Sequence, residues 1–284
     1  MQPMQPIRIV ALTALAMLAF AANSLLCRLA LAKSHIDPAS FTAIRLVSGA
    51  IMLSLIVTLR DNQPAGHGNW LSALALFIYA AGFSFAYIGL TASTGALLLF
   101  GAVQVTMIGV GLRRGERFRL AQTIGFLAAI IGLVLLLLPG LSTPPLASSM
   151  MMLAAGGAWG VYSLRAKGAG DATCVTAGNF LRAAPIAVLT YLLMWRQSHL
   201  DHIGLLCALA SGAIASGVGY AVWYAALRHL SATTAATLQL SVPIIASLGG
   251  MVFLSEHLSS TLFIAAVLML GGMALVIFGR AKNS

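Results

Sequence analysis

Charged residues are scarce in this sequence of 284 residues. Asp, Glu, Lys and Arg make up 8% of the chain, whereas they make up about 25% of a typical soluble domain. Hydrophobic residues account for 60%, and the mean hydropathy is +0.96. A water-soluble fold of this size has too little interior to bury so many apolar side chains. The composition therefore excludes a soluble globular protein and predicts that lipid surrounds most of the chain.

Acidic residues are the scarcest charges, with 6 Asp+Glu against 16 Lys+Arg and a formal net charge of +10. All of them stand in predicted loops or at helix ends: Asp37, Asp61, Glu116, Asp171, Asp201 and Glu256. Proton-coupled carriers usually keep an ionisable group inside the membrane, so this pattern argues against a carboxylate relay. The basic residues stand in short loops between apolar runs, which indicates topology signals and lipid headgroups and not a nucleic-acid partner.

Potential ligands for metals and groups for catalysis are also few. Cys27, Cys174 and Cys207 lie in or at the ends of apolar runs with no close pair, which suggests neither a disulfide framework nor a zinc site. The six histidines are scattered singly, so no metal site and no cofactor are predicted. No apolar run contains paired acids, a Ser/His pair or an HExxH helix, so the sequence does not predict an enzyme.

Long apolar runs occupy most of the chain. A helix needs about 20 apolar residues to cross the hydrocarbon core, and ten runs meet this length approximately: 9–31, 40–59, 70–90, 94–112, 120–138, 147–164, 173–195, 203–227, 232–254 and 261–279. The first run has features of a signal peptide, but it continues past the candidate cleavage site and has a counterpart in mid-chain. We expect it to be retained. The predicted fold class is an all-α integral membrane protein with ten transmembrane helices.

The positive charges fall mainly on one side of these ten spans. The tails and the even-numbered connections carry eleven basic residues, and the other side clearly carries only Lys33 and Arg196. Positive loops stay in the cytoplasm, so both termini are predicted to be cytoplasmic.

The two halves of the chain match each other at an offset of 137–140 residues. Residues 19–24 align with 158–163, 44–46 with 181–183, 85–87 with 222–224, and 115–118 with 255–258. This order predicts two five-helix repeats, over residues 9–138 and 147–279. Because five is odd, the second repeat is expected to be inverted, which places a binding site between the halves near the membrane midplane and supports alternating access. Duplication can also build a scaffold or a channel.

Several short motifs give the chain a family resemblance that covers nearly its whole length. They are Trp159-Gly160, the arginines Arg45 and Arg182 in the second and seventh spans, Val242-Pro243 in the ninth, Gly115-Glu116-Arg117 and Ser255-Glu256-His257. With ten spans in two copies, they resemble the EamA-type transporters of the drug/metabolite transporter superfamily. The resemblance implies a bacterial inner-membrane exporter of amino acids and related compounds. The first copy departs from the pattern with Phe20-Ala21 and Val103-Gln104.

Aromatic residues form two stripes at equivalent places in the two halves. Tyr79, Phe83 and Tyr87 share one helix face at a spacing of four residues, and Tyr220 and Tyr224 repeat the last two positions. We expect these stripes to line a cavity that accepts an apolar or aromatic side chain, with Tyr79 and Tyr220 deepest. The alternative is that they pack against neighbouring helices or form interfacial belts.

Polar groups within the spans are the other candidates for substrate binding. Side-chain amides both donate and accept hydrogen bonds, which suits a zwitterionic amino acid. The alternative for each is an interhelical hydrogen bond. The candidates are Asn23, Ser24, Gln104, Thr106, Tyr162, Ser163, Asn179, Gln239 and Ser241, and Trp159 adds a ring.

Gating is predicted from one proline and from charges that connect the repeats. Pro243 removes a backbone hydrogen bond within the ninth span and predicts a hinge near Gln239. By topology, Arg45 and Glu256 fall on the periplasmic side, and Arg182 and Glu116 on the cytoplasmic side. The hypothesis is that each pair forms a latch. Alternatively, the two glutamates simply stabilise helix N-termini.

The sequence thus predicts an exporter of neutral or zwitterionic metabolites, most of all apolar or aromatic amino acids, driven by a gradient and working by alternating access. Its expected partners are a small-molecule substrate and the lipid bilayer, with no nucleic acid, and a monomer is expected to suffice. A broad-specificity drug or cationic-metabolite exporter is the alternative. A membrane-embedded enzyme or a structural protein is more remote.

Overall fold

The first half of the chain folds into five helices. The computed structural model describes residues 5–61, 67–113, 119–138, 144–166, 170–230 and 232–281, and within these ranges it contains helices and no strand. The helices of the first half are α1 (Pro6–Lys33), α2 (Pro38–Asp61), α3 (Trp70–Ala86), α4 (Ala92–Arg113) and α5 (Leu120–Leu137).

The second half repeats this pattern with three local differences. It consists of α6 (Leu146–Ala166), α7 (Ala172–Leu193), the short 3₁₀ helix η1 (Trp195–Gln197), α8 (His202–Leu209), η2 (Ala210–Val218), α9 (Gly219–Leu227), α10 (Ala232–Gln239), α11 (Ser241–Leu254) and α12 (Ser260–Ala281). α8, η2 and α9 form one continuous helix, and α10 and α11 are separated only by Leu240. Each predicted span therefore corresponds to one helix or to one consecutive group of helices.

Residue types account for the close packing at η2 and for the break between α10 and α11. η2 is a π-helix rich in small residues, and a Cβ atom on Gly212 would overlap with Ser48 Oγ and the Arg45 carbonyl of α2. Pro243, which is buried near the start of α11, has no N–H to donate to the Gln239 carbonyl, and the helix is interrupted at Leu240 between them. The helix is therefore broken next to Gln239 in this structure, and the role of this break as a hinge stays a prediction.

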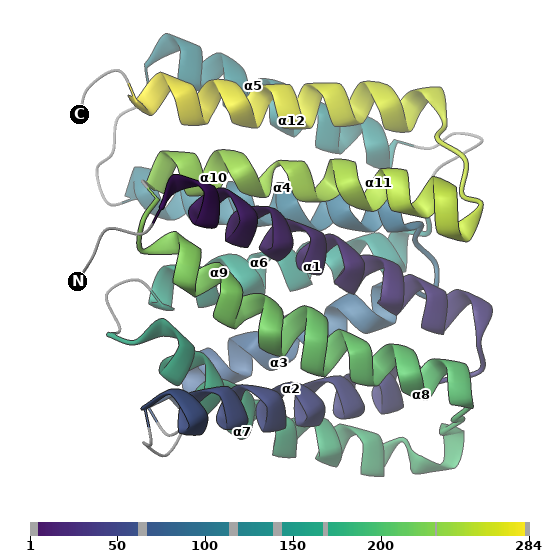
Figure 1. Cartoon of the computed structure of the whole chain (residues 1–284). Coiled ribbons are helices and arrows are strands. Elements are labelled where there is room, and N and C mark those ends of the chain that lie inside the picture. The colour runs from purple at the N-terminus through teal and green to yellow at the C-terminus, as the bar shows by residue number, and fades with distance from the viewer. Residues whose placement is uncertain are drawn as a thin grey trace.

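The chain turns at two opposite ends of the bundle. One end, which we call the Glu256 end, includes residues 34–37, 87–91, 198–201 and 255–259. The other, the Arg60 end, includes Arg60 and residues 67–69, 170–171 and 228–230. α1 begins and α12 ends at the Arg60 end (Figure 1). Of the described basic residues near helix ends, Arg28, Lys33 and Arg196 lie at the Glu256 end, and the larger group lies at the Arg60 end: Arg8, Arg60, Arg113, Arg119, Arg165 and Arg228.

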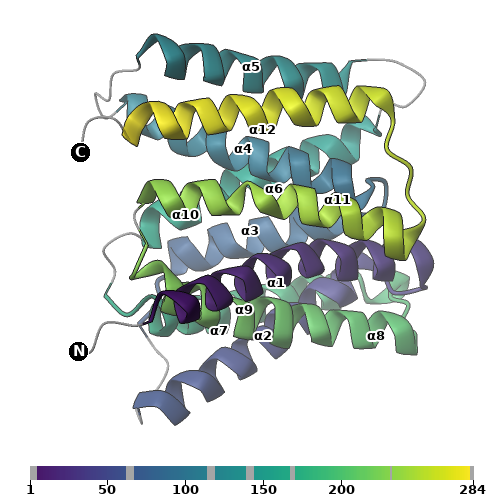
Figure 2. The same ribbon diagram turned by 45° about the horizontal axis from the view of Figure 1, so that its top comes forward.

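The packing of the helices repeats when the two halves are exchanged. α5 packs against α12, and α2 packs against α7. α3 packs on α6 as α9 packs on α1, and α4 packs on α6 as α11 packs on α1. The α5–α12 pair forms one edge of the bundle in both views (Figures 1 and 2), where Gly125 and Gly272 let the two backbones meet. Two halves with the same internal plan enclose the centre between them.

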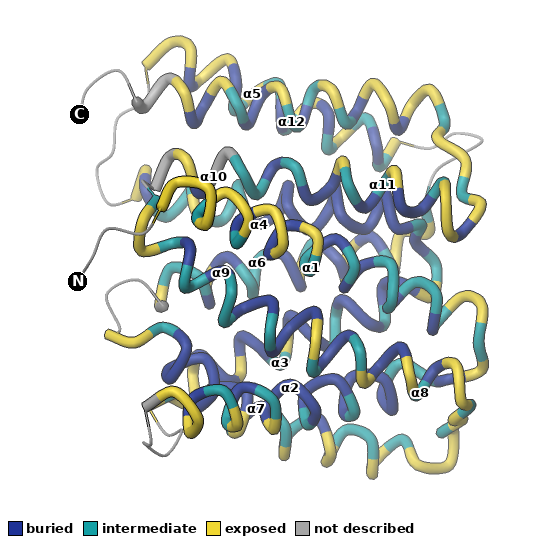
Figure 3. The backbone as a smooth tube through the Cα atoms, in the orientation of Figure 1, coloured by how far each residue is buried: buried dark blue, intermediate teal, exposed yellow. Residues whose placement is uncertain are grey.

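The outer surface of the bundle is apolar. α5 exposes Ile124, Leu127 and Ile131 on one face, and α12 exposes Phe263 and Val267 (Figure 3). Trp70 at the Arg60 end and Trp195 at the Glu256 end are 63% and 59% exposed. Apolar patches of this extent are typical of a lipid-facing surface.

By length and composition, seven of the described helical segments are apolar enough to cross a membrane. They are Pro6–Lys33, Pro38–Arg60, Ala92–Arg113, Leu120–Leu137, Ala172–Leu193, His202–Leu227 and Ser260–Phe278. α3 and α11 are apolar but shorter.

Candidate functional site

A cavity of about 210 Å³ lies between the two halves. It is lined by residues of α1, α3 and α4 from the first half and of α6, α7, η2, α9 and α10 from the second. The lining includes these residues proposed from the sequence: Asn23, Ser24, Tyr79, Phe83, Trp159, Ser163, Tyr220, Tyr224 and Gln239. The two aromatic stripes therefore meet at one site.

Trp159 of α6 is the centre of the aromatic cluster. Its ring lies 4.8 Å from that of Tyr79 and stacks on those of Tyr220 and Tyr162 at 5.5 and 5.3 Å. On the opposite wall, Phe20 of α1 lies 5.6 Å from Tyr220. The cavity is thus bounded by rings from both halves, which suits a flat apolar group.

Six of the proposed binding residues are not in the cavity lining: Tyr87, Gln104, Thr106, Tyr162, Asn179 and Ser241. Tyr87 is fully buried, with its ring edge-on to Phe83 at 4.7 Å and its hydroxyl donating to the Ala92 carbonyl at 3.4 Å. Tyr162 lies behind Trp159, and Gln104 of α4 is outside the lining. Each was proposed from its position in a span, and position alone does not set the distance from the centre.

The sequence reasoning missed Phe20 and Trp223, which both line the cavity. A signal for each was present, because Phe20 aligns with Trp159 in the repeat and Trp223 lies within the match between residues 85–87 and 222–224. Leu99, Phe100, Ala172, Ala215, Ser216 and Leu227 complete the lining, and nothing in the sequence distinguishes them from other apolar or small residues.

Two tyrosine hydroxyls at the cavity accept hydrogen bonds from polar groups behind them. Tyr79 accepts from Arg45 Nη2 at 3.0 Å and from Asn23 Nδ2 at 3.5 Å, and Asn23 in turn accepts from Ser211 at 2.6 Å. In the second half, Tyr224 accepts from Thr176 at 3.2 Å. Thr176 accepts from Tyr162 at 3.2 Å, and Tyr162 from Asn179 at 3.4 Å. Three of the predicted polar candidates, Asn23, Tyr162 and Asn179, thus take part in hydrogen bonds between helices.

The cavity extends toward the Arg60 end. Its lining includes Ala172, the first residue of α7, and Leu227, the last residue of α9. At this end the exposed side chains of Arg60 and Asp171 form an ion pair, and Arg165 donates to Ser72 Oγ and Asn69 Oδ1, both at 3.1 Å. These contacts join the ends of helices at the rim of the bundle.

Asp171, just before α7, accepts a hydrogen bond from the Cys174 N–H at 2.9 Å. Partial burial acts to raise the pKa of this carboxyl, but the Cys174 N–H and the Arg60 guanidinium outweigh it and hold the pKa below its ordinary value. Asp171 is therefore an ionised helix cap at neutral pH.

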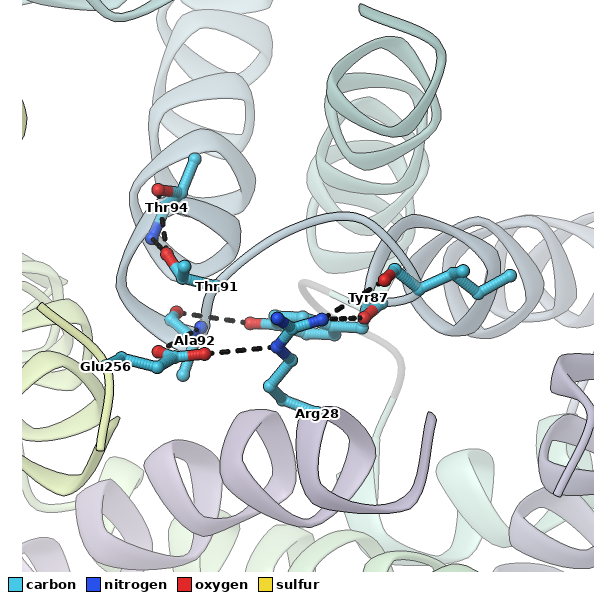
Figure 4. A network of polar contacts seen from close by, with 7 residues as sticks. Arg28, Tyr87, Thr91, Ala92, Thr94 and Glu256 are labelled. Carbon is cyan, nitrogen blue, oxygen red and sulfur yellow. Dashed lines mark hydrogen bonds and ion pairs between the residues drawn. The ribbon is translucent and has the colours of Figure 1, made fainter. Parts of the chain in front are cut away.

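A polar network joins three parts of the chain at the Glu256 end (Figure 4). Arg28 of α1 pairs with Glu256 through Nε at 3.1 Å and donates through Nη1 to the carbonyls of Tyr87 and Ile88 at 2.9 and 3.1 Å. The other carboxylate oxygen of Glu256 accepts from the Ala92 N–H at 2.8 Å. The network ties α1 to the α3–α4 and α11–α12 loops, and none of these residues belongs to the described cavity lining.

The predicted pairing of Arg45 with Glu256 is wrong in this structure. Glu256 follows α11, which packs against α1 and α4, so its partner is Arg28. Arg45 lies on α2, which packs against α3, α7, α8 and η2. For the other predicted pair, Arg182 donates to the Gly178 carbonyl at 2.9 Å, and Glu116 lies outside the described residues.

Comparisons with known proteins agree with this architecture. The sequence profile of the EamA-like transporter family matches residues 7–138 and 146–278. The uncharacterized protein PA1977 of Pseudomonas aeruginosa is 54% identical over 281 residues, which cover 97% of this chain and 98% of that protein. A protein of known crystal structure aligns over 99% of this chain and 100% of its own with a TM-score of 0.70 and 20% identity, which shows the same fold. The chain is therefore a multi-pass membrane protein and a member of the EamA-like transporter family.

Proposed function

We propose that this transporter exports small neutral or zwitterionic metabolites, most of all amino acids with apolar or aromatic side chains, across the bacterial inner membrane. The observation that carries the proposal is the ring-lined cavity between the two halves, which extends toward one end of the bundle only. Such a site binds an apolar side chain through the rings and a polar headgroup through the tyrosine hydroxyls and amides.

The proposed mechanism is alternating access between two inverted five-helix repeats. Support comes from the packing pattern, which repeats when the halves are exchanged, and from the odd number of spans in each half. The larger number of basic residues at the Arg60 end supports placing that end, with both termini, in the cytoplasm. In this orientation the cavity extends toward the cytoplasm, and the Arg28–Glu256 network closes the periplasmic side.

The size of the cavity favours a small cargo. Pockets that hold drug-sized ligands usually measure about 300–1,000 Å³, and this cavity measures about 210 Å³. A small metabolite therefore fits the site better than a large drug. The ring-rich wall is also the feature that supports the alternative, a cationic-metabolite exporter, because aromatic faces attract cations.

The driving force is proposed to be the gradient of the substrate itself, or coupling through a group other than a buried acid. The described cavity lining contains no Asp or Glu, and intramembrane carboxylates are the usual proton carriers in coupled transporters. A single chain supplies every lining residue, so we expect a monomer in the bilayer to be sufficient, without a cofactor or a nucleic-acid partner.

Counterflow in proteoliposomes tests the proposal. The purified protein is reconstituted, the vesicles are loaded with an unlabelled amino acid, and entry of the labelled compound is followed for a panel that includes phenylalanine, leucine and arginine. We expect counterflow with the apolar and aromatic members and the same initial rate with and without an imposed proton gradient. Absence of counterflow with every amino acid would refute the substrate assignment, and strict dependence on the proton gradient would refute the energetic one.

A further inference from the structure

Arg45 is a buried cation that has no counter-charge in the part of the chain that the structure describes. The residue is 1% exposed, and its Nε and Nη1 atoms have no hydrogen-bond partner among the residues that the structure describes. Its guanidinium carbon lies 5.2 and 5.0 Å from the ring centroids of Tyr79 and Phe83. Rings stabilise a cation only modestly, whereas an unpaired charge in a membrane interior is costly. The positive charge of Arg45 is therefore not balanced by a negative charge among the described residues.

The neighbouring groups do not supply a negative charge. The titratable side chains that interact electrostatically with Arg45 are Tyr79 of α3, Tyr220 of α9 and Cys27 of α1, and phenols and thiols are ordinarily neutral at physiological pH. Asn23 and Ser211, which continue the hydrogen-bond chain from Tyr79, are neutral as well. An anion at this site must therefore come from outside the described chain.

Tyr79 connects this positive charge to the cavity. Its hydroxyl oxygen accepts hydrogen bonds from Arg45 and Asn23, so its own proton is left to donate, and no acceptor for that proton occurs among the described residues. The residue lines the cavity. A hydroxyl that accepts from a guanidinium is polarised and becomes a stronger donor, which suits an anionic acceptor in the cavity.

The second half provides an internal comparison. Tyr224 also lines the cavity and also accepts a hydrogen bond, but the donors behind it are Thr176, Tyr162 and Asn179, which are all neutral. Arg182, the counterpart of Arg45 in the repeat, is only partly buried and donates to the Gly178 carbonyl of its own helix. The positive charge is thus placed behind one of the two cavity hydroxyls.

We infer that the cavity recognises the carboxylate of its substrate, with Tyr79 donating a hydrogen bond to it and Arg45 supplying the compensating positive charge. The inference rests on the proposed function and deepens it, since it names the chemical group that is required and extends the cargo from zwitterionic amino acids to simple carboxylates. The cargo class is a monocarboxylate with an apolar or aromatic body. An amino group is not required, because the described lining has no carboxylate to pair with it.

Equilibrium dialysis of the purified protein in detergent tests this with three labelled compounds of similar shape. Phenylalanine carries both charged groups, 3-phenylpropionate only the acid and phenylethylamine only the amine. We expect the wild-type protein to bind both acids at least tenfold more tightly than the amine. Tyr79→Phe should lower the ratio of acid to amine affinity about tenfold or more, as expected for loss of a hydrogen bond to a charged group, and Arg45→Gln should lower it further.

Matched variants separate recognition of the charge from loss of a hydroxyl or of structure. Tyr224→Phe removes a cavity hydroxyl with neutral donors behind it, so it should weaken binding of the acids and of the amine by a similar factor and leave the acid-to-amine ratio within twofold of wild type. Tyr191→Phe and Arg196→Gln, both near η1 and outside the cavity, should match wild type throughout. If Arg45→Gln does not fold, the result for Tyr79→Phe decides whether the carboxylate site exists. This variant removes a single oxygen atom and is therefore expected to fold.

The outcomes distinguish this inference from the proposed function. Amine binding as tight as acid binding, or an unchanged ratio in Tyr79→Phe, overturns the carboxylate site even where counterflow of phenylalanine is observed. Counterflow of phenylethylamine alone leaves a transporter but refutes the inference. If none of the three compounds binds or moves, both proposals fail.

Discussion

Tyr87 and Tyr224 hold matching positions in the two halves but have different environments. Tyr87 is fully buried at the Glu256 end, where its carbonyl accepts from Arg28 and its hydroxyl donates to the Ala92 carbonyl. Tyr224 lines the cavity on the side of the Arg60 end and accepts from Thr176. Two halves with the same helix packing thus form two different ends. The Glu256 end is closed by the Arg28–Glu256 network, and the cavity extends toward the Arg60 end. The difference is what a carrier with two access states requires, since only one side is open at a time.

The largest effect is expected from breaking the ion pair at the closed end. Glu256→Gln removes the charge that Arg28 binds, and hydrogen bonds to charged groups contribute about 1.5–3 kcal/mol each. We expect the variant to unfold at lower temperature in detergent. In a background with Cys174 and Cys207 replaced by alanine, Cys27, which is buried beside Arg28, should become reactive toward a water-soluble maleimide. Unchanged reactivity would show that the network does not close this end.

The packing around Tyr87 provides the next test. A Cβ atom on Gly95 would lie 2.6 Å from Tyr87 Cζ, whereas one on Gly109, in the same helix, would meet nothing within 4 Å. Gly95→Ala should therefore cost about 1–3 kcal/mol through overpacking, and Gly109→Ala should stabilise α4 by up to about 1 kcal/mol. Thermal unfolding of the two variants measures the difference. Equal shifts would mean that Tyr87 is not tightly packed.

Removing each tyrosine hydroxyl sharpens the comparison. Tyr87→Phe loses one hydrogen bond at the closed end and should lower stability by about 0.5–1.5 kcal/mol, with the KM for counterflow unchanged. Tyr224→Phe should raise the KM severalfold, because its hydroxyl belongs to the cavity. The opposite pattern, with KM affected by Tyr87 alone, would place the substrate at the closed end.

The smallest effect on stability is expected at the Arg60 end. Arg60 and Asp171 have 40% and 46% exposed side chains, and exposed ion pairs contribute about 0.2–1 kcal/mol. Arg60→Gln should therefore lower stability by less than about 1 kcal/mol at pH 7. Because the pKa of Asp171 is lowered in the folded protein, its contribution is complete above the ordinary aspartate pKa and is lost as pH falls through the lowered value. Thermal unfolding from pH 7 to pH 3 should show the two proteins converging, and a constant difference would contradict this.

Part of this architecture could be predicted from residue patterns. Apolar run length predicted the helical segments, and helical spacing placed Tyr79, Phe83, Tyr220 and Tyr224 on faces that now line one cavity. Tyr87 lies on the same helix face as Tyr79 but in a different environment. Tyr79 lines the cavity, whereas Tyr87 is buried against the start of α4 at the Glu256 end. This difference depends on how distant helices pack, which no local pattern in the sequence encodes.

The ion pairs were harder to predict for a geometric reason. Arg28 had no assigned role, since it lies close to the end of its span, and its partner Glu256 lies 228 residues away in the chain. The pairing depends on how α1 packs between α9 and α11, which no local spacing encodes. Arg45 was predicted to form a latch with Glu256, and its neutral and aromatic surroundings become visible only when α1, α3 and α9 are placed around it.

The four tryptophans of the chain are divided between the centre and the two surfaces. Trp159 and Trp223 line the cavity, whereas Trp70 and Trp195 are exposed at opposite ends, where indole rings favour the membrane–water interface. A protein with Trp70→Phe and Trp195→Phe therefore emits only from its cavity, and its fluorescence reports occupancy without an added dye. A protein with Trp159→Phe and Trp223→Phe keeps only the tryptophans at the two ends. Quenchers attached at known depths in the lipid then locate both membrane boundaries on the fold.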